Sequence, residues 1–205
     1  MMVLGVTGGI ATGKSFVTHI FCVLGALVVS ADELAREVVV PGAPALQKLV
    51  EHFGPSVLLT DGNLNRKALA EIIFADPRAR IDLNGIMHPA IAQLAEQRLR
   101  ALARDRRLVV YEAPLLFEAG AEGRVDAVLV VTADERQQVR RLMARDEIGE
   151  PAARARINSQ MPLSEKIRRA DYIIDNSGTL QQTEAQVRKL FVHLQSRLPA
   201  LDPVL

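Results

Sequence analysis

The chain of 205 residues is predicted to fold as an α/β protein, with a parallel sheet core flanked by helices. Two observations lead to this prediction. Short β-branched runs bounded by polar, glycine or proline residues alternate with helical patterns, as expected for buried parallel strands. A glycine-rich phosphate-binding motif also follows the first of these runs directly. The expected strands are residues 2–6, 27–30, 108–112, 127–132 and 172–174.

The phosphate-binding motif is GGIATGKS at residues 8–15, which fills the pattern G-x-x-x-x-G-K-[ST]. Its glycines allow a tight turn that points backbone N–H groups at phosphate oxygens, and the following helix contributes the positive end of its dipole. Lys14 adds a positive charge, and the hydroxyl of Ser15 can ligate Mg²⁺. The core is therefore predicted to be of the P-loop NTPase type. Its expected ATP contacts are Gly9, Ile10, Ala11, Thr12, Gly13, Lys14, Ser15 and Phe16.

A helical insert is expected between the second and third strands. Almost eighty residues there show no convincing strand, which is more than a simple crossover needs. Apolar stripes and turn residues predict helices over 46–53 and 68–73, a turn at 61–62, a helix starting at Pro77 after an Asp76 cap, and a longer helix from Pro89 to about Leu102. The arginines at 104, 106 and 107 are interpreted as a solvated helix end, with a substrate role as the alternative.

An arginine-rich segment follows the fourth strand and is punctuated by Gly149 and Pro151. Charged helices usually form a solvated face, but beside a phosphate site they can also form a lid that closes over phosphates. We therefore expect a single domain with three parts. These are a core of about 1–31, 108–139 and 170–205, a helical insert of about 32–107 that binds the acceptor, and a helical lid of about 140–169.

Composition limits the partners. Lys and Arg total 25 against 24 acidic residues, and a net charge of +1 provides no field for holding nucleic acid. The longest apolar run, 21–29, is too short to span a bilayer, and no basic leader precedes it. The single cysteine, Cys22, excludes an internal disulfide and is expected to be a small buried residue of the first helix. We expect a cytoplasmic monomer or small homo-oligomer without nucleic-acid or membrane partners.

Two carboxylates stand at expected strand ends, where ligands bind in open α/β sheets. Asp32 follows the second strand, beside the P-loop strand or close to it, and could accept the proton of an attacking hydroxyl. The alternative is a helix N-cap, since a helical stripe follows. Glu112 ends the third strand, which resembles a Walker B strand that holds Mg²⁺ directly or through water. The alternative is an acid merely exposed at a strand end.

Further motifs extend through the chain. They are TGGIATGKS at 7–15, ADELAR at 31–36, PGAPAL at 41–46, HPAI at 88–91, EAPLLFE at 112–118, RRLMARD at 140–146 and ADYIIDNSG at 170–178. With these motifs in this order, the chain resembles the dephospho-coenzyme A kinase family over essentially its full length. That family transfers the γ-phosphoryl group of ATP to the 3′-hydroxyl of the dephospho-CoA ribose, the last step of coenzyme A synthesis.

The resemblance implies roles for residues that match the motifs. It makes Asp32 the catalytic base, assigns phosphate and Mg²⁺ contacts to Lys14 and Ser15, and makes Arg141 and Arg145 catalytic arginines of the lid. The two arginines are four residues apart and hence on one helix face, where they could clamp the transferring phosphoryl group.

The same resemblance implies that Asn176 lies near the adenine and that Arg36 and His88 belong to the acceptor side. His88 precedes Pro89, so it is expected at a helix junction. A hydrogen-bonded structural histidine is an equal alternative there.

Three residues depart from the family pattern. The family usually has glycine at Ala11, which is tolerable only if that position keeps a negative φ. It usually has aspartate at Ser30, so Asp32 is left as the surviving acid, and threonine at Phe16, which can offer the α-phosphate only its backbone N–H.

Two rival functions remain open at this point. A kinase for a nucleoside monophosphate or shikimate would share the P-loop and the lid. A GTPase-type switch is disfavoured because the sequence has no Asn-Lys-x-Asp segment for reading guanine.

Overall fold

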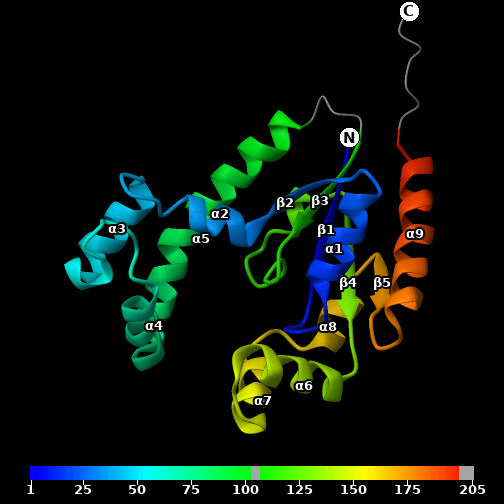
Figure 1. The fold of residues 1–205 in the computed structure, drawn as a ribbon. Coiled ribbons are helices and arrows are strands. Elements are labelled where there is room, and N and C mark those ends of the chain that lie inside the picture. The colour runs from blue at the N-terminus through cyan, green and yellow to red at the C-terminus, as the bar shows by residue number, and fades with distance from the viewer. Residues whose placement is uncertain (103–106, 199–205) are drawn as a thin grey trace, which may run out of the picture. The chain divides into compact units, whose positions relative to one another are not determined.

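The computed structural model describes residues 1–102 and 107–198. Within them, five strands form one parallel sheet in the order β2-β3-β1-β4-β5 (Figure 1). The strands are β1 (Met2–Gly8), β2 (Leu27–Ser30), β3 (Leu108–Glu112), β4 (Ala127–Thr132) and β5 (Tyr172–Asp175). The predicted fold class and all five expected strands are confirmed, and β1 and β5 extend slightly beyond the expected ends.

β1 lies in the middle of the sheet and is buried along its whole length. Its neighbours are β3 and β4, with Val6 opposite Glu112 and Gly8 opposite Val131. Because the strands are parallel, their carboxyl ends meet at one edge, where β1 leads into the glycine-rich loop. β2 is one strand further out, since β3 separates it from β1.

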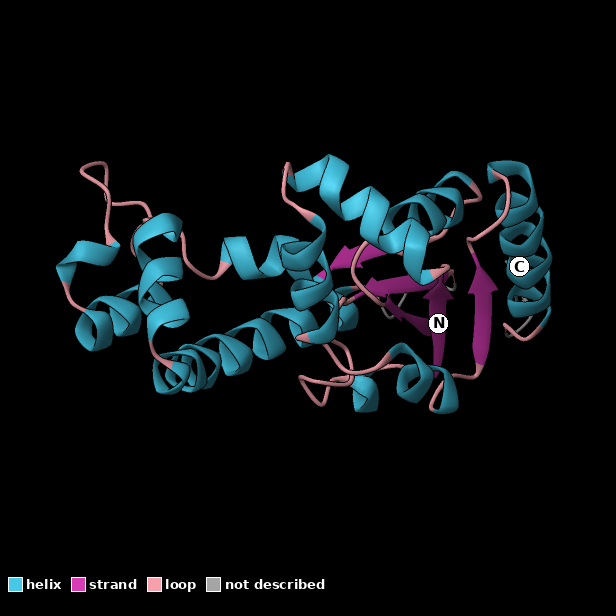
Figure 2. Cartoon of the chain, turned by 90° about the horizontal axis from the view of Figure 1, so that it is seen from below, coloured by secondary structure: helices cyan, strands magenta, loops and turns pink. Residues whose placement is uncertain are grey.

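Helices line both sides of the sheet (Figure 2). The main core joins the sheet to α1 (Lys14–Val23) and α9 (Leu180–Ser196), with the Phe21 and Phe191 ring centroids 6.3 Å apart. Cys22 is exposed, so its expected burial is wrong. It follows Phe21, and one step around a helix turns the next side chain about 100° away from the core. The remaining helices of this part are α6 (Glu135–Asp146), α7 (Glu150–Asn158), α8 (Leu163–Arg168) and the short η2 (Glu122–Arg124).

Residues 31–98 form a compact unit separate from residues 1–30 and 99–205. Its helices are α2 (Ala31–Glu37), α3 (Pro44–Phe53), η1 (Pro55–Val57), α4 (Arg66–Ala75) and α5 (Pro77–Ala101), the last of which extends past the unit. Leu46 and Leu49 of α3 form its core together with Leu83 and Ile86 of α5. The expected turn is present at Gly62, which has φ 80°.

α5 joins two helices that we expected to be separate. The predicted helix start at Pro77 is confirmed, but this helix runs through Pro89, where we expected the longer helix to begin. An interior proline lacks the N–H that would bond the Gly85 carbonyl and costs about 3 kcal/mol. Apolar packing on both sides of the proline, by Ile86 and by Ala90, offsets this cost.

The arginine cluster at the end of the insert is only partly described. Arg104 and Arg106 lie outside the described residues, and Arg107 is exposed. Across the described ranges 1–102 and 107–198, no helix has the length and apolar character needed to cross a bilayer.

Candidate active site

The glycine-rich loop connects β1 to α1 and needs glycine at two positions for steric reasons. A Cβ on Gly8 would lie 2.3 Å from the Val131 carbonyl oxygen of β4. A Cβ on Gly13 would lie 2.1 Å from Nδ2 of Asn176, and Gly13 also has φ 89°. Both spacings are shorter than any real contact, so the loop closes against β4 and the end of β5 only when these residues lack side chains.

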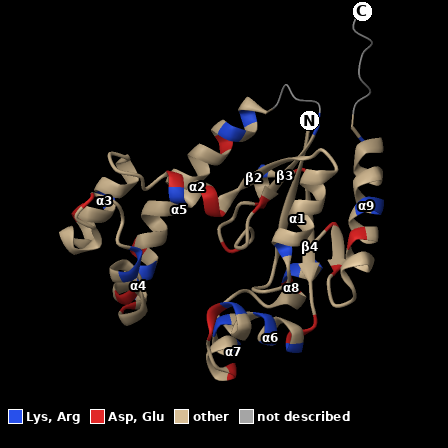
Figure 3. Ribbon diagram, in the orientation of Figure 1, with Lys and Arg blue, Asp and Glu red and all other residues tan. Residues whose placement is uncertain are grey.

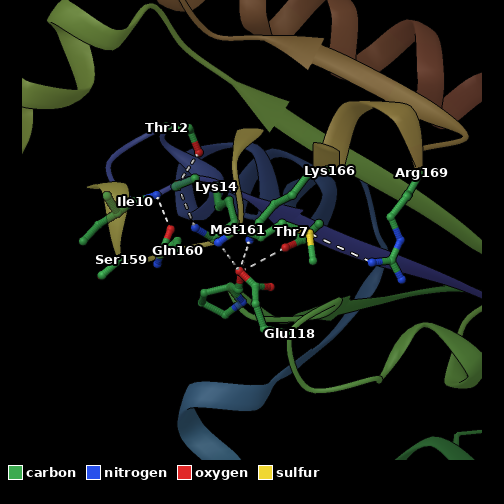
Figure 4. A network of polar contacts seen from close by, with 12 residues as sticks. Thr7, Ile10, Thr12, Lys14, Glu118, Ser159, Gln160, Met161, Lys166 and Arg169 are labelled. Atoms are coloured by element: carbon green, nitrogen blue, oxygen red, sulfur yellow. Dashed lines mark hydrogen bonds and ion pairs between the residues drawn. The ribbon is translucent and has the colours of Figure 1, made fainter. Parts of the chain in front are cut away.

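Hydrogen bonds hold the loop around the Gly9 carbonyl. Thr12 is fully buried, and its Oγ1 donates to Gly9 O at 2.9 Å. Lys14 Nζ donates to the same oxygen at 3.3 Å, so the ammonium group folds back over the loop (Figure 4). The predicted arrangement of a glycine turn, a lysine and a helix N-terminus is therefore present. The first N–H groups of a helix have no intrahelical acceptor, which makes this end of α1 a site for anions.

Asn176 holds the loop from the end of β5. Its side chain is buried, Nδ2 donates to Thr12 O at 2.8 Å, and Oδ1 accepts from Thr183 Oγ1 at 2.8 Å. In a trans peptide the C=O and N–H groups point in opposite directions. Fixing the Thr12 carbonyl toward Asn176 therefore turns the Gly13 N–H the other way. The side-chain amide of Asn176, which we expected near the adenine, therefore forms hydrogen bonds within the protein, one of them to the loop itself.

Arg141 of α6 reaches the same loop. Its guanidinium donates to the carbonyls of Ala11, Thr12 and Asn176 at 3.5, 3.4 and 3.1 Å. Arg145, one turn further along α6, instead pairs with Asp146 at 2.7 Å. The hydrogen bonds that Arg145 donates to the Asp146 carboxylate raise the pKa of Arg145 and lower the pKa of Asp146. The structure thus brings one of the two expected arginines to the loop.

Charges of both signs cover α6 and α7 (Figure 3). Arg154 pairs with Glu135 and Glu150, and Arg156 pairs with Asp146. These pairs are largely exposed and are worth little to stability individually. The Arg154–Glu135 and Arg156–Asp146 pairs connect α7 to α6, and the two helices form a hairpin.

The two residues expected to hold Mg²⁺ lie within contact distance. Ser15 Oγ, in the first turn of α1, is 3.3 Å from Glu112 Oε1 at the end of β3. Val6 and Glu112 are register partners, which explains why the acid stands beside the loop that follows β1. A hydroxyl and a carboxylate are oxygen ligands of the kind that Mg²⁺ prefers, so the residues present fit this ion.

Two further expected ATP contacts have their backbone N–H groups bonded to protein acceptors. The Phe16 N–H donates to Gly13 O at 3.1 Å. The Ile10 N–H donates to Oε1 of Gln160 at 2.9 Å. Gln160 belongs to the segment between α7 and α8 and was not anticipated from the sequence. Beside it lies a cavity of about 250 Å³ bordered by Gly9 and Ile10.

Ala11 has φ 59°, so the condition under which we expected a side chain to be tolerable here, a negative φ, is not met. A residue with a Cβ in the left-handed region carries about 1–2 kcal/mol of strain. Compensating contacts are present, since Ala11 and Ile10 pack against Leu142 and Ala153 of the α6–α7 hairpin.

The expected acceptor-side residues belong to the separate unit of residues 31–98. Asp32 and Arg36 are both exposed on α2, four residues apart and therefore on one face of that helix. α2 begins at Ala31, so Asp32 lies in the first turn rather than at the N-cap position. His88 is half-buried inside α5, and the expected helix junction at this residue is wrong.

A parallel sheet with this loop, a lysine and a serine at the start of α1, and a nearby arginine-bearing hairpin defines a P-loop kinase. Comparisons with known proteins give the particular family. The family model described as dephospho-CoA kinase matches residues 2–182. The chain therefore belongs to the dephospho-CoA kinase family.

Individual proteins agree with this assignment. The chain is 56% identical to the dephospho-CoA kinase of Syntrophotalea carbinolica over 204 residues, covering 99% of this chain and 97% of that protein. It is 49% identical to the dephospho-CoA kinase of Moorella thermoacetica, with 99% and 96% covered. The solved dephospho-CoA kinase of Campylobacter jejuni has a TM-score of 0.74 at 30% identity, covering 95% of this chain and 97% of its own.

The function expected from the motifs is confirmed. The chain is an enzyme that phosphorylates dephospho-CoA with ATP to give coenzyme A. Family membership decides against a kinase for a nucleoside monophosphate or shikimate and against a GTPase-type switch.

Proposed function

We propose that the enzyme transfers the γ-phosphoryl group in line from Mg·ATP, held by the loop at residues 8–15, directly to the 3′-hydroxyl of dephospho-CoA. The observation that supports this most is the Ser15 to Glu112 contact at 3.3 Å beside the Lys14 ammonium. It combines phosphate-binding and Mg²⁺-binding groups at one strand edge. Phosphoryl transfer depends mainly on positioning and charge stabilisation, which such a site supplies.

The loop residues have the charge and donors that ATP phosphates require. Lys14 leaves the Gly9 carbonyl and contacts the β- and γ-phosphates, while backbone N–H groups from Gly13 to Ser15 bind oxygens of the same groups. Ser15 and Glu112 hold Mg²⁺, which neutralises charge on the phosphate oxygens when bound. The amide of Asn176 keeps the Gly13 N–H directed into this cradle.

Arg141 and Arg145 are proposed as lid arginines that act on the transferring phosphoryl group. Arg141 already contacts the carbonyls of Ala11 and Thr12, so a small rotation of its side chain brings donors to a phosphate in the loop. Arg145 must exchange Asp146 for the phosphate. Bidentate guanidinium donors suit oxygens that gain charge in the transition state.

Asp32 is proposed as the base that accepts the proton of the 3′-hydroxyl. It is an exposed carboxylate directly after the end of β2, and Ser30 leaves no second acid at that strand end. Arg36, on the same face of α2, and His88 of α5 are proposed to contact the acceptor. We further propose a cytoplasmic enzyme that is a monomer or small homo-oligomer and binds no nucleic acid or membrane.

Acceptor-dependent ADP release tests the proposal. Wild-type protein with Mg²⁺ and ATP should release ADP rapidly with dephospho-CoA and slowly with nucleoside monophosphates, shikimate or no acceptor. Lys14→Ala should nearly abolish release, and Lys189→Ala, an exposed lysine of α9, is the matched control. Full turnover without an acceptor would contradict the proposal, as would activity that does not depend on Mg²⁺.

A further inference from the structure

Lys166 of α8 is fully buried, which is rare for a lysine. Its Nζ pairs with Glu118 Oε1 at 2.8 Å and donates to the Pro114 carbonyl at 3.0 Å. Both partners belong to the segment that leaves β3 after Glu112. The lysine therefore connects α8 to the strand exit that carries the proposed Mg²⁺ carboxylate.

The Pro114 carbonyl also accepts a hydrogen bond from the strand that leads into the glycine-rich loop. Thr7 Oγ1, fully buried on β1, donates to it at 3.1 Å. Figure 4 shows the Thr7 and Lys166 side chains converging beside Glu118. One oxygen thus joins the end of β1, the exit of β3 and α8.

Other contacts from α8 and the residues around it hold the same segment. The Met161 N–H donates to Glu118 Oε1 at 3.2 Å. The Arg169 guanidinium lies 4.2 Å from the centre of the Phe117 ring and pairs with Glu122. Of these contacts, only those of Lys166 reach Pro114, two residues after Glu112.

Stability alone gives little reason for a lysine here. Burying the Lys166 ammonium costs several kcal/mol of solvation, its partner Glu118 is partly exposed, and a well-packed apolar residue is often equally stabilising. What an apolar side chain lacks is a donor for the Pro114 carbonyl. The directional contact with this oxygen is therefore the property that distinguishes a lysine.

We propose that Lys166 is a positioning residue for the Mg²⁺ site. By holding the Pro114 carbonyl and Glu118, it fixes the exit of β3 so that Glu112 faces Ser15. The inference rests on the proposed role of Glu112 and adds to it a residue that does not touch the ion. Residues that orient metal ligands typically change metal affinity 10- to 100-fold when replaced.

The test measures the Mg²⁺ concentration that gives half-maximal activity. In Lys166→Met this concentration should rise about 10-fold or more, while the KM for dephospho-CoA stays within about threefold. Thr7→Val, which removes the other donor to Pro114, should shift it in the same direction. Arg169→Met is the matched control, because it loosens the same segment from α8 without touching Pro114, and it should leave the Mg²⁺ dependence unchanged.

A double variant separates positioning from folding. Lys166→Met leaves the partly exposed Glu118 carboxylate without its charged partner, whereas Lys166→Met with Glu118→Gln leaves no unpaired carboxylate beside the apolar Met side chain and should recover part of any lost thermal stability. We expect the Mg²⁺ dependence of the double variant to stay shifted. Recovery of both properties would overturn the proposal, as would a fall in kcat with an unchanged Mg²⁺ dependence in Lys166→Met.

Glu112→Gln distinguishes this inference from its premise. If Glu112→Gln shifts the Mg²⁺ dependence and Lys166→Met does not, the positioning role is overturned and the metal role of Glu112 survives. If Glu112→Gln causes no shift, the metal role fails and the inference fails with it.

Discussion

Asn176→Asp tests whether the end of β5 sets the conformation of the phosphate loop. The substitution keeps the shape of the side chain and replaces the amino group that donates to Thr12 O at 2.8 Å with an oxygen. The Thr183 hydroxyl can still donate to the other oxygen. The change therefore removes one buried donor and places a negative charge against a carbonyl oxygen.

The expected size follows from the burial of this site, where Asn176 is 3% exposed. Thr12 O keeps only the longer hydrogen bond from Arg141 at 3.4 Å, and a buried acceptor that loses its main donor costs up to about 1–3 kcal/mol. In a domain of about 200 residues, each kcal/mol lowers Tm by about 2–4 °C, so we expect a loss of at most about 2–12 °C. The Gly13 N–H should lose its fixed direction, and Mg·ADP affinity should fall about tenfold or more, which corresponds to about 1.4 kcal/mol.

Thermal unfolding and calorimetric binding of Mg·ADP provide the measurements, with Thr183→Val as the matched control that spares the Thr12 contact. The reasoning is refuted if the variant binds Mg·ADP as tightly as wild type, or if its Tm equals that of wild type. A changed preference between ATP and GTP without a loss of stability would instead support an adenine contact.

The remaining predictions concern the base, the arginines and the strained loop residue. Asp32→Asn should lower kcat about 10²- to 10⁴-fold with little change in ATP affinity, and a loss of under about threefold in steady-state kinetics would remove the base role. Arg141→Lys should lower kcat about 10²-fold or more. Arg145→Lys should have the same effect only if Arg145 leaves Asp146 to bind the phosphate. A wild-type kcat in both variants would refute the role of these arginines in phosphoryl transfer. Ala11→Val should destabilise the protein by about 1–3 kcal/mol in thermal unfolding because a β-branched residue at φ 59° is strained, whereas Ala11→Gly should not.

The sheet could be predicted closely because each strand is a short apolar run with polar ends, even though the edge strands β2 and β5 are only partly buried. The order of the strands could not, since it depends on which crossovers pack, and β3 rather than β2 proved to be the neighbour of β1. The start of α5 at Pro77 was predicted, but the second helix start expected at Pro89 was wrong. Proline is a strong local signal for a helix start, and at Pro89 the packing of Ile86 and Ala90 on the insert core outweighs it.

The phosphate loop was predictable because its chemistry depends on spacing along the chain. Gly8, Gly13, Lys14 and Ser15 act through a turn and a helix start that eight consecutive residues specify. The supports of the loop come from distant segments, and nothing in the spacing of Gln160 relates it to the Ile10 N–H, 150 residues away. Such pairs are determined by tertiary packing.

Lys166 shows most clearly what a charge pattern leaves undetermined. Its segment is dense in arginine, and apart from Arg141 and Arg145, which the family resemblance singled out, its cations were interpreted together as a solvated face or part of a lid. Arg154 and Arg156 agree with a solvated face, since the side chains of both arginines are exposed in their ion pairs. Lys166 has the same charge but lies fully buried against Pro114 and Glu118. Because the desolvation penalty depends on burial and not on residue type, the same charge is incidental at one position and consequential at the other. Lys166 of α8 contacts residues that closely follow Glu112 along the chain. With Glu112 proposed to hold Mg²⁺, this proximity makes the buried charge of Lys166 relevant to catalysis rather than to stability alone.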